Sequence, residues 1–307
     1  MSNLLYNSSL DTPMSRQDLH NVITPAPMGP RHHPYSFAEF ADNTVHAIQR
    51  AGYTVTEEDF AVQKDGMRMF GLLKVSNAPD HVPSQALTVA PSENVPALYE
   101  PKWDLLVGVR GANDQSIARG LLVGTRVMVC SNLQFDGNLG VWKRKQTTNI
   151  ESEMPDIIGH AVSQLDRKQK EFSIDFDAFN RIQISRDDGD RILLDILRDE
   201  RASLSASQLE RALGHWDKLP KEVEEHGANG RNLWWLFNAC TFALKPTGAN
   251  NNHSDKADQS ATIYHHLRLA VGNYLKAGRV RLGSAQTKDF SPRPVSLSAQ
   301  TKDLYLS

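Results

Sequence analysis

The apolar residues of this chain change their spacing near residue 149. Before that point, apolar stretches are short and are separated by turns containing Gly, Pro and Asn, which is typical of β-strands. After it, apolar residues recur every three or four positions, which is the period of an amphipathic helix. The sequence therefore predicts an α+β fold, with an antiparallel β-rich N-terminal half and a helical C-terminal half.

The same pattern divides the chain into four segments. Residues 1–35 are rich in Pro, and they are expected to form an extended arm because Pro fixes φ and lacks an amide donor. Residues 36–149 are predicted to be a β-rich core with one leading helix, and residues 150–280 a helical region packed on the sheet. Residues 281–307 are a polar tail in which the sequence SAQTKD occurs twice. The repeat indicates either a local duplication, or a paired docking peptide or strands that add to the edge of a neighbour's sheet.

Local signals place several elements. Ser36 and Glu39 form a capping-box pattern before a helix that Gly52 is expected to end. Asp65-Gly66 predicts a tight hairpin turn. Further strands are expected at 105–109, 126–130 and 141–147, and further helices around 154–165, 192–197, 209–213, 233–244 and 263–274. Four glycines indicate tight connections or close backbone approach between the strands: Gly108, Gly111, Gly120 and Gly124.

Composition limits the class of protein. Lys plus Arg is 34 and Asp plus Glu is 36, which gives a net charge of -2. This balance gives no whole-chain attraction to nucleic acid. The N-terminus lacks an apolar signal-peptide region, and no apolar run reaches the ~18 residues of a membrane span. The two cysteines, Cys130 and Cys240, are too few for a secreted disulfide framework. We therefore expect a cytoplasmic protein with no membrane partner.

The common catalytic and cofactor motifs are absent from this sequence. It contains no phosphate-binding loop ending in Lys-Ser or Lys-Thr, no GxGxxG after a strand, and no HExxH, GxSxG or paired CxxC. The adjacent pairs His32-His33 and His265-His266 make poor shared metal ligands, because neighbouring side chains point in different directions. We therefore predict no catalytic residue, no cofactor and no metal, and the balance leans away from an enzyme.

One basic segment suggests a binding surface. Trp142, Lys143, Arg144 and Lys145 follow one another, and residues 102–148 hold seven basic and three acidic side chains, a local excess of four. Cations beside an aromatic ring suit nucleic acid, because cations contact phosphates and a ring stacks on a base. We include Arg126 with these four residues as predicted nucleic-acid contacts. The alternative interpretation is an edge strand that its lysines protect from aggregation.

A second group of polar residues lies near predicted strand ends. Asp114, Ser116, Cys130 and Asn132 carry groups that could act on or bind a small ligand if they met in one pocket. Cys130 would act as a nucleophile activated by a nearby base. The alternative interpretation is structural: Cys130 as a small packed residue and Asn132 as the residue that ends its strand.

Several short motifs resemble the phage- and plasmid-encoded family called domain of unknown function 932, over roughly residues 15–275. The motifs are Phe70-Gly71-Leu72, Gly108-Val109-Arg110, Asp114-Gln115-Ser116, Gly124-Thr125-Arg126-Val127, Val129-Cys130-Ser131-Asn132-Leu133, Lys145-Gln146-Thr147 and Asn232-Leu233-Trp234. The resemblance implies an accessory protein of a mobile element, located in the host cytoplasm, with no established activity.

The chain departs from that family at two positions. Asn113 and Gln146 stand where the family tends to have histidines. If the family uses those histidines as bases or metal ligands, this chain should lack that chemistry. Asn and Gln still form hydrogen bonds, so a structural or binding role would survive. The departures favour a protein that is not an enzyme.

Three hypotheses follow. The first is a non-enzymatic phage or plasmid accessory protein that binds DNA or RNA, in particular single strands, as a homo-oligomer. The second is an enzyme or small-ligand binder that uses the Asp114, Ser116, Cys130 and Asn132 group. The third is an inhibitor that binds a host protein.

Overall fold

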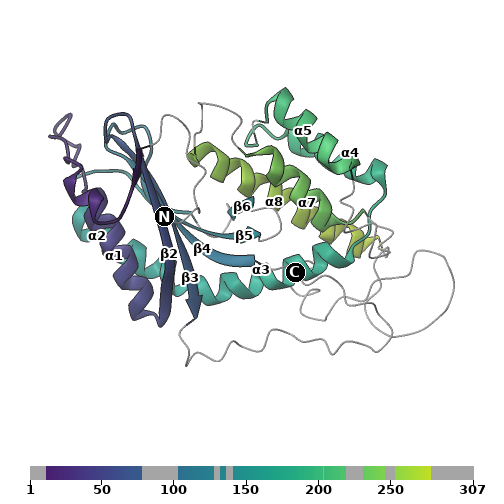
Figure 1. Cartoon of the computed structure of the whole chain (residues 1–307), viewed down its shortest axis with the longest axis horizontal. Coiled ribbons are helices and arrows are strands. Elements are labelled where there is room, and N and C mark those ends of the chain that lie inside the picture. The colour runs from purple at the N-terminus through teal and green to yellow at the C-terminus, as the bar shows by residue number, and fades with distance from the viewer. Residues whose placement is uncertain are drawn as a thin grey trace. The chain divides into compact units, whose positions relative to one another are not determined.

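The computed structural model describes residues 12–77, 103–127, 132–135, 141–202, 204–218, 231–245 and 253–277. The chain divides into two compact units. The first contains residues 1–168 and 245–257, and the second contains residues 169–244 and 258–307. The predicted α+β class is confirmed: the strands belong to the first unit, and most of the helices follow in sequence (Figure 1).

The strands described form one antiparallel sheet in the order β1-β2-β3-β4-β5-β6, with β7 also beside β5. Their bounds are β1 (Thr12–Met14), β2 (Tyr53–Gln63), β3 (Arg68–Asn77), β4 (Trp103–Ala112), β5 (Arg119–Val127), β6 (Asn132–Phe135) and β7 (Val141–Arg144). Strands β6 and β7 share one edge of β5, because β6 pairs with residues 124–127 and β7 pairs with residues 119–122.

Strand β5 is longer than the sequence predicted. We expected a strand at 126–130, whereas β5 runs from residue 119 to residue 127. Gly120 and Gly124 lie inside this strand rather than in connections. Of the two interpretations offered for the glycines, close backbone approach holds at Gly120: a Cβ there would lie 2.5 Å from the carbonyl oxygen of Trp142. The apolar residues between the two glycines are almost fully buried.

Helices α1 (Phe37–Arg50) and α2 (Ile150–Ser163) pack on the sheet within the first unit, and they also contact each other. The predicted cap of α1 is confirmed, since the hydroxyl of Ser36 accepts a hydrogen bond of 3.4 Å from the amide of Glu39. Gly52 follows the helix with φ +83°, the left-handed conformation expected of a stop. Figure 1 shows α1 beside β2, and the contacts of α2 are with β5 and β7.

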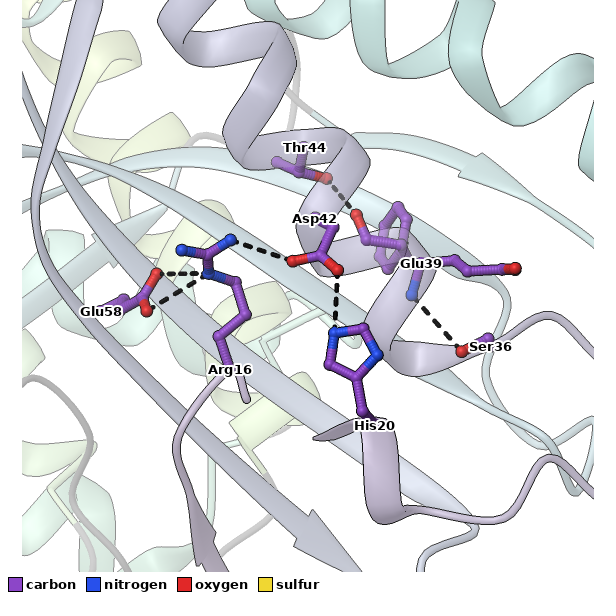
Figure 2. A network of polar contacts seen from close by, with 8 residues as sticks. Arg16, His20, Ser36, Glu39, Asp42, Thr44 and Glu58 are labelled. Atoms are coloured by element: carbon purple, nitrogen blue, oxygen red, sulfur yellow. Dashed lines mark hydrogen bonds and ion pairs between the residues drawn. The ribbon is translucent and has the colours of Figure 1, made fainter. Parts of the chain in front are cut away.

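The N-terminal segment lies along this body. Pro13 in β1 pairs with Ala61 at the edge of the sheet, which is where a strand tolerates Pro. Beyond β1, Arg16 donates to Glu58 of β2 at 3.0 Å and to Asp42 of α1 at 2.9 Å (Figure 2). His20, in the short 3-10 helix η1 (Asp18–Asn21), lies 3.0 Å from Asp42. These contacts fix part of the predicted arm to both α1 and β2.

The predicted hairpin turn is also confirmed. β2 and β3 are joined by residues 64–67, and the amide of Met67 donates to the carbonyl of Lys64 at 3.0 Å. Asp65 and Gly66 occupy the two central positions with φ of +52° and +82°, and Lys64 before them also has a positive φ of +51°. Positive φ at both positions defines the type I′ turn, whose twist matches that of the paired strands.

The second unit contains α4 (Arg186–Arg198), α5 (Ala206–Asp217), α7 (Leu233–Ala243) and most of α3 (Leu165–Arg181) and α8 (His253–Lys276). Its core holds a cluster of aromatic rings from α3, α7 and α8. The cluster consists of Phe172, Phe176, Phe179, Trp234, Phe237 and Tyr264. Helix α3 was not among the predicted helices, although its three phenylalanines recur at helical spacing.

Gly71 gives a test of the packing of the sheet. It lies opposite Phe60, and a Cβ at Gly71 would come within 2.3 Å of the Phe60 ring and 2.8 Å of Val109. Replacing Gly71 with Ala is expected to lower the free energy of unfolding by about 1–3 kcal/mol through overpacking. The control is Gly159→Ala in α2, where nothing lies within 4 Å and helix propensity favours Ala by ~0.5–1 kcal/mol. Urea denaturation of both variants checks the sign; equal stability of Gly71→Ala and wild type would contradict it.

Candidate nucleic-acid interface

Strand β7 carries the basic segment that the sequence singled out. It pairs with β5 so that Arg144 lies opposite Arg119 and Trp142 lies opposite Leu121. Successive side chains of a strand point to opposite faces, so Trp142 and Arg144 share one face and Lys143 lies on the other. The ring of Trp142 makes an edge contact with His160 of α2 at 5.9 Å, and Arg144 forms an ion pair with Glu153 of α2. Trp142 and Arg144 therefore join β7 to α2.

Lys143 and Lys145 are the exposed cations of this segment. Within the described part of the chain, neither lysine forms an ion pair with a carboxylate. Lys143 lies opposite Gly120, where a Cβ would come within 3.0 Å of the Lys143 Cβ. The glycine thus leaves room for the lysine at the edge of the sheet.

Arg126 does not extend this group along the sheet. It is described in its backbone alone, where it pairs with Asp104 of β4 and Leu133 of β6. It lies six positions along β5 from Gly120, the partner of Lys143, which is about 20 Å along a strand. β7 pairs with the opposite end of β5, so Arg126 is not beside the other four predicted contacts, and its assignment as a nucleic-acid contact stays a prediction.

Asp114 and Ser116 lie together in the turn between β4 and β5. The carboxylate of Asp114 accepts hydrogen bonds from the hydroxyl of Ser116 and from its amide, the latter at 3.0 Å. Arg68 lies 3.2 Å and Lys64 3.6 Å from the same carboxylate. Burial raises the pKa of Asp114, but the hydrogen bonds from Ser116 and the charge of Arg68 outweigh it, and the pKa lies below its ordinary value. A carboxylate that is ionised and already paired is a poor general base.

The four residues of the second hypothesis do not form one site. Asn132 pairs with Val127, which in turn pairs with Trp103 at the start of β4. Asp114 follows the other end of β4, and the nine-residue separation between Trp103 and Ala112 spans about 30 Å. Cys130 lies outside the described residues. The predicted shared pocket is therefore corrected: the register keeps Asp114 and Ser116 apart from Asn132.

Arg119, at the start of β5 and opposite Arg144 of β7, is a buried cation that the sequence did not reveal. Arg119 of β5 has no exposed surface, and its guanidinium carbon lies 4.4 Å from the centre of the Phe37 ring. Nη2 of Arg119 donates to the carbonyl of Tyr35 and, at 2.8 Å, to Oδ1 of Asn113. Burial lowers the pKa of the Arg119 guanidinium to about 9, so it still carries its charge at neutral pH.

Asn113 and Gln146, the two positions singled out by the predicted resemblance, are both buried here. The side-chain amide of Gln146 donates to the carbonyl of Ala112 at 2.6 Å, and its oxygen accepts from the amide of Tyr35 at 3.2 Å. The side-chain oxygen of Asn113 accepts from Arg119, and the backbone amide of Asn113 donates to the carbonyl of Met67 at 2.7 Å. The Gln146 side chain thus connects the segment before α1 with the end of β4, and the Asn113 side chain connects the β4–β5 turn with Arg119 of β5.

One histidine of each pair has a carboxylate partner, and the second cysteine is buried. His33 lies 3.1 Å from Glu151, and His266 lies 2.9 Å from Asp199. The hydrogen bonds from Arg201, together with that from His266, hold the pKa of Asp199 well below its usual range. Burial raises the pKa of the Cys240 thiol to about 12, so this cysteine is a neutral thiol at neutral pH. Across the described ranges, no three His, Cys, Asp or Glu side chains are grouped so that they could hold a metal ion.

Comparisons of the chain with protein-family models, with curated proteins and with solved structures found no match. The resemblance to the family of domain of unknown function 932 therefore stays a prediction. Among the helices that the structure describes, none has both the length and the apolar character needed to cross a bilayer.

Proposed function

We propose that this chain is a non-enzymatic protein that binds the phosphate backbone of nucleic acid at the edge of its sheet, through Lys143 and Lys145. The observation that carries the proposal is the exposure of both lysines, with no ion pair to any carboxylate in the described residues. Exposed, unpaired cations can release the counterions of a polyphosphate, which is the main source of sequence-independent affinity. Cations that are already paired with carboxylates contribute less to this affinity.

The proposal assigns different roles to the other residues of the segment. Arg144 is compensated by Glu153, and Trp142 packs against His160, so both hold β7 in place on α2. Trp142 is not assigned the base-stacking role that the sequence suggested, because its ring is partly covered by α2. Recognition through phosphates alone implies weak dependence on nucleic-acid sequence.

The proposal retains the class that the family resemblance implies, an accessory protein of a phage or plasmid that acts in the host cytoplasm. It also retains assembly as a homo-oligomer. Several copies would place several lysine pairs on one strand, and linked weak contacts raise the overall affinity steeply. Light scattering with and without a single-stranded oligonucleotide measures this part of the proposal separately.

A double variant, Lys143→Gln with Lys145→Gln, tests the assignment. We expect the affinity for a single-stranded oligonucleotide to fall about tenfold at low salt, and the slope of log K against log salt to shrink by about 1.4, since each lost phosphate contact contributes ~0.7. The measurement is fluorescence anisotropy across a series of salt concentrations.

The control for this variant removes the same number of positive charges from another part of the chain. Lys218 and Lys276 are also exposed and lie in the second unit, and Lys218→Gln with Lys276→Gln removes two positive charges without touching β7. Arg144→Gln is expected to change affinity less than Lys143→Gln or Lys145→Gln, because Glu153 already offsets the charge of Arg144. Equal losses in the β7 pair and the control pair would show that net charge, and not this edge, governs binding.

A further inference from the structure

The segment before α1 presents an arginine on a fixed turn. The amide of His32 donates to the carbonyl of Gly29 at 3.0 Å, which closes a β-turn. Pro30 and Arg31 occupy its two central positions, and Pro favours the first of them because its φ is already fixed near the required value. His32 is buried, and its Nδ1 accepts a hydrogen bond of 3.0 Å from the amide of Met28. Arg31 therefore extends from a backbone that is already ordered.

This turn lies beside the lysines of the proposed phosphate-binding edge. The amide of His33 donates to the carbonyl of Gln146 at 3.0 Å, and the amide of Tyr35 donates to the side-chain oxygen of Gln146 at 3.2 Å. Gln146 directly follows Lys145, so the two bonds hold the residues after the turn against the end of the basic segment. The reach of the chain and the width of one backbone hydrogen bond keep the Cα atoms of Arg31 and Lys145 within about 16 Å of each other.

The charge of Arg31 is uncompensated within the described residues. Arg31 is exposed, and in that part of the chain no carboxylate forms an ion pair with it. Glu151 reaches the same segment, but its contact is with His33, at 3.1 Å. The Glu151 side chain is 66% exposed, so water screens much of its charge. Arg31, Lys143 and Lys145 are thus three exposed cations at one edge, and they come from segments far apart in the sequence.

We propose that Arg31 is a third phosphate contact of this edge, so that the nucleic-acid backbone lies across the turn at residues 29–32 and the end of β7. The inference rests on the proposed function of Lys143 and Lys145, and it extends that function to the segment before α1. Each phosphate contact adds to the affinity and to its dependence on salt. The guanidinium adds a planar pair of donors that matches two phosphate oxygens, which a lysine cannot offer. Because the turn is already ordered, binding loses little backbone freedom there.

Arg31→Gln tests this assignment, with Arg50→Gln as the matched control. Arg50 is the last residue of α1, it is exposed, and it forms no ion pair in the described residues. It lies about 20 Å along the helix from Phe37, where α1 begins. In fluorescence anisotropy with a single-stranded oligonucleotide, we expect Arg31→Gln to weaken binding about threefold at low salt and to reduce the slope of log K against log salt by about 0.7. Arg50→Gln should change both less, because salt screens charges that lie beyond a Debye length.

A second variant is expected to change the affinity in the opposite direction. Glu151→Gln removes the negative charge that lies beside His33, and it should raise the affinity because phosphates passing this segment are no longer repelled. The control is Glu210→Gln, the same substitution at an exposed position of α5 in the second unit. A larger gain in Glu151→Gln than in Glu210→Gln supports the inference. Equal gains would place the phosphates away from residues 31–33 and would overturn it.

The outcomes separate this inference from the proposed function. Saturable binding by the wild-type chain, with equal losses in Arg31→Gln and Arg50→Gln, would overturn the inference and would leave the two lysines as the site. Absence of binding by the wild-type chain at about 50 mM salt would overturn the proposed function and this inference together.

Discussion

Replacing Phe176 with alanine is expected to lower the free energy of unfolding by about 3–5 kcal/mol, the range for removing a large ring from a packed core. Phe176 has no exposed surface and lies at the centre of the aromatic cluster of the second unit. Its ring centre is 5.0 Å from that of Trp234 and 5.6 Å from that of Phe237. Truncation would leave a cavity bounded by rigid rings, which cannot collapse without leaving their packed positions.

Urea unfolding measures this loss, with tryptophan fluorescence as the signal because Trp234 packs directly on Phe176. Phe176→Leu is the matched control: it retains more of the apolar volume and should cost less than the alanine variant. A loss below about 1 kcal/mol for Phe176→Ala, as at a surface site, would contradict the placement of this ring in the core.

Replacing Asp175 with alanine is also expected to lower the free energy of unfolding strongly. Asp175 is fully buried, it accepts a hydrogen bond from the hydroxyl of Tyr264, and its carboxylate lies 3.2 Å from Nε of Arg268. Removing one partner of a buried ion pair costs about 3–5 kcal/mol, because the other charge stays in place without compensation. We expect about 3 kcal/mol, the lower end of that range, since the Arg268 side chain keeps 19% of its surface exposed to water.

The control for this variant is the neighbouring carboxylate of the same helix. Asp177 pairs with Arg181 one helical turn later, and its side chain is 45% exposed. Asp177→Ala should cost about 0.3–0.5 kcal/mol through the lost pair, as exposed helical ion pairs do. Similar losses at positions 175 and 177, measured by the same urea titration, would show that burial does not set the strength of the Asp175 contacts.

The parts of the fold that could be predicted are those set by local chemistry. The cap at Ser36, the stop at Gly52 and the type I′ turn at Asp65-Gly66 each depend on residues within a few positions of one another. The change of apolar spacing near residue 149 likewise predicted the α+β class. These signals need no knowledge of which strands pair.

The parts that were missed depend on contacts between distant residues. Gly120 resembles a turn residue, yet its place is inside β5 because the backbone of β7 lies against it. Pairing of this kind is a property of the sheet and not of the local sequence. Helix α3 was missed for a different reason: its phenylalanines lie among charged residues, and their spacing at 172, 176 and 179 was the available signal.

The candidate site was predictable only in part. The basic residues 143–145 were recognised by composition, but strand alternation and the contacts with α2 decide which of them are exposed: Lys143 in β7 and Lys145 just after it. Arg119 was counted as one cation among seven, because nothing in the sequence near it indicates burial. Its position under Phe37 arises from the packing of α1 on the sheet.

The most direct test of the proposed function is an equilibrium titration of the wild-type chain with labelled single-stranded DNA, double-stranded DNA and RNA, at about 50 mM salt and then at increasing salt. The account predicts saturable binding of at least the single-stranded probes, with an affinity that falls steeply as salt rises. Absence of binding to all three probes at the lowest salt would contradict it.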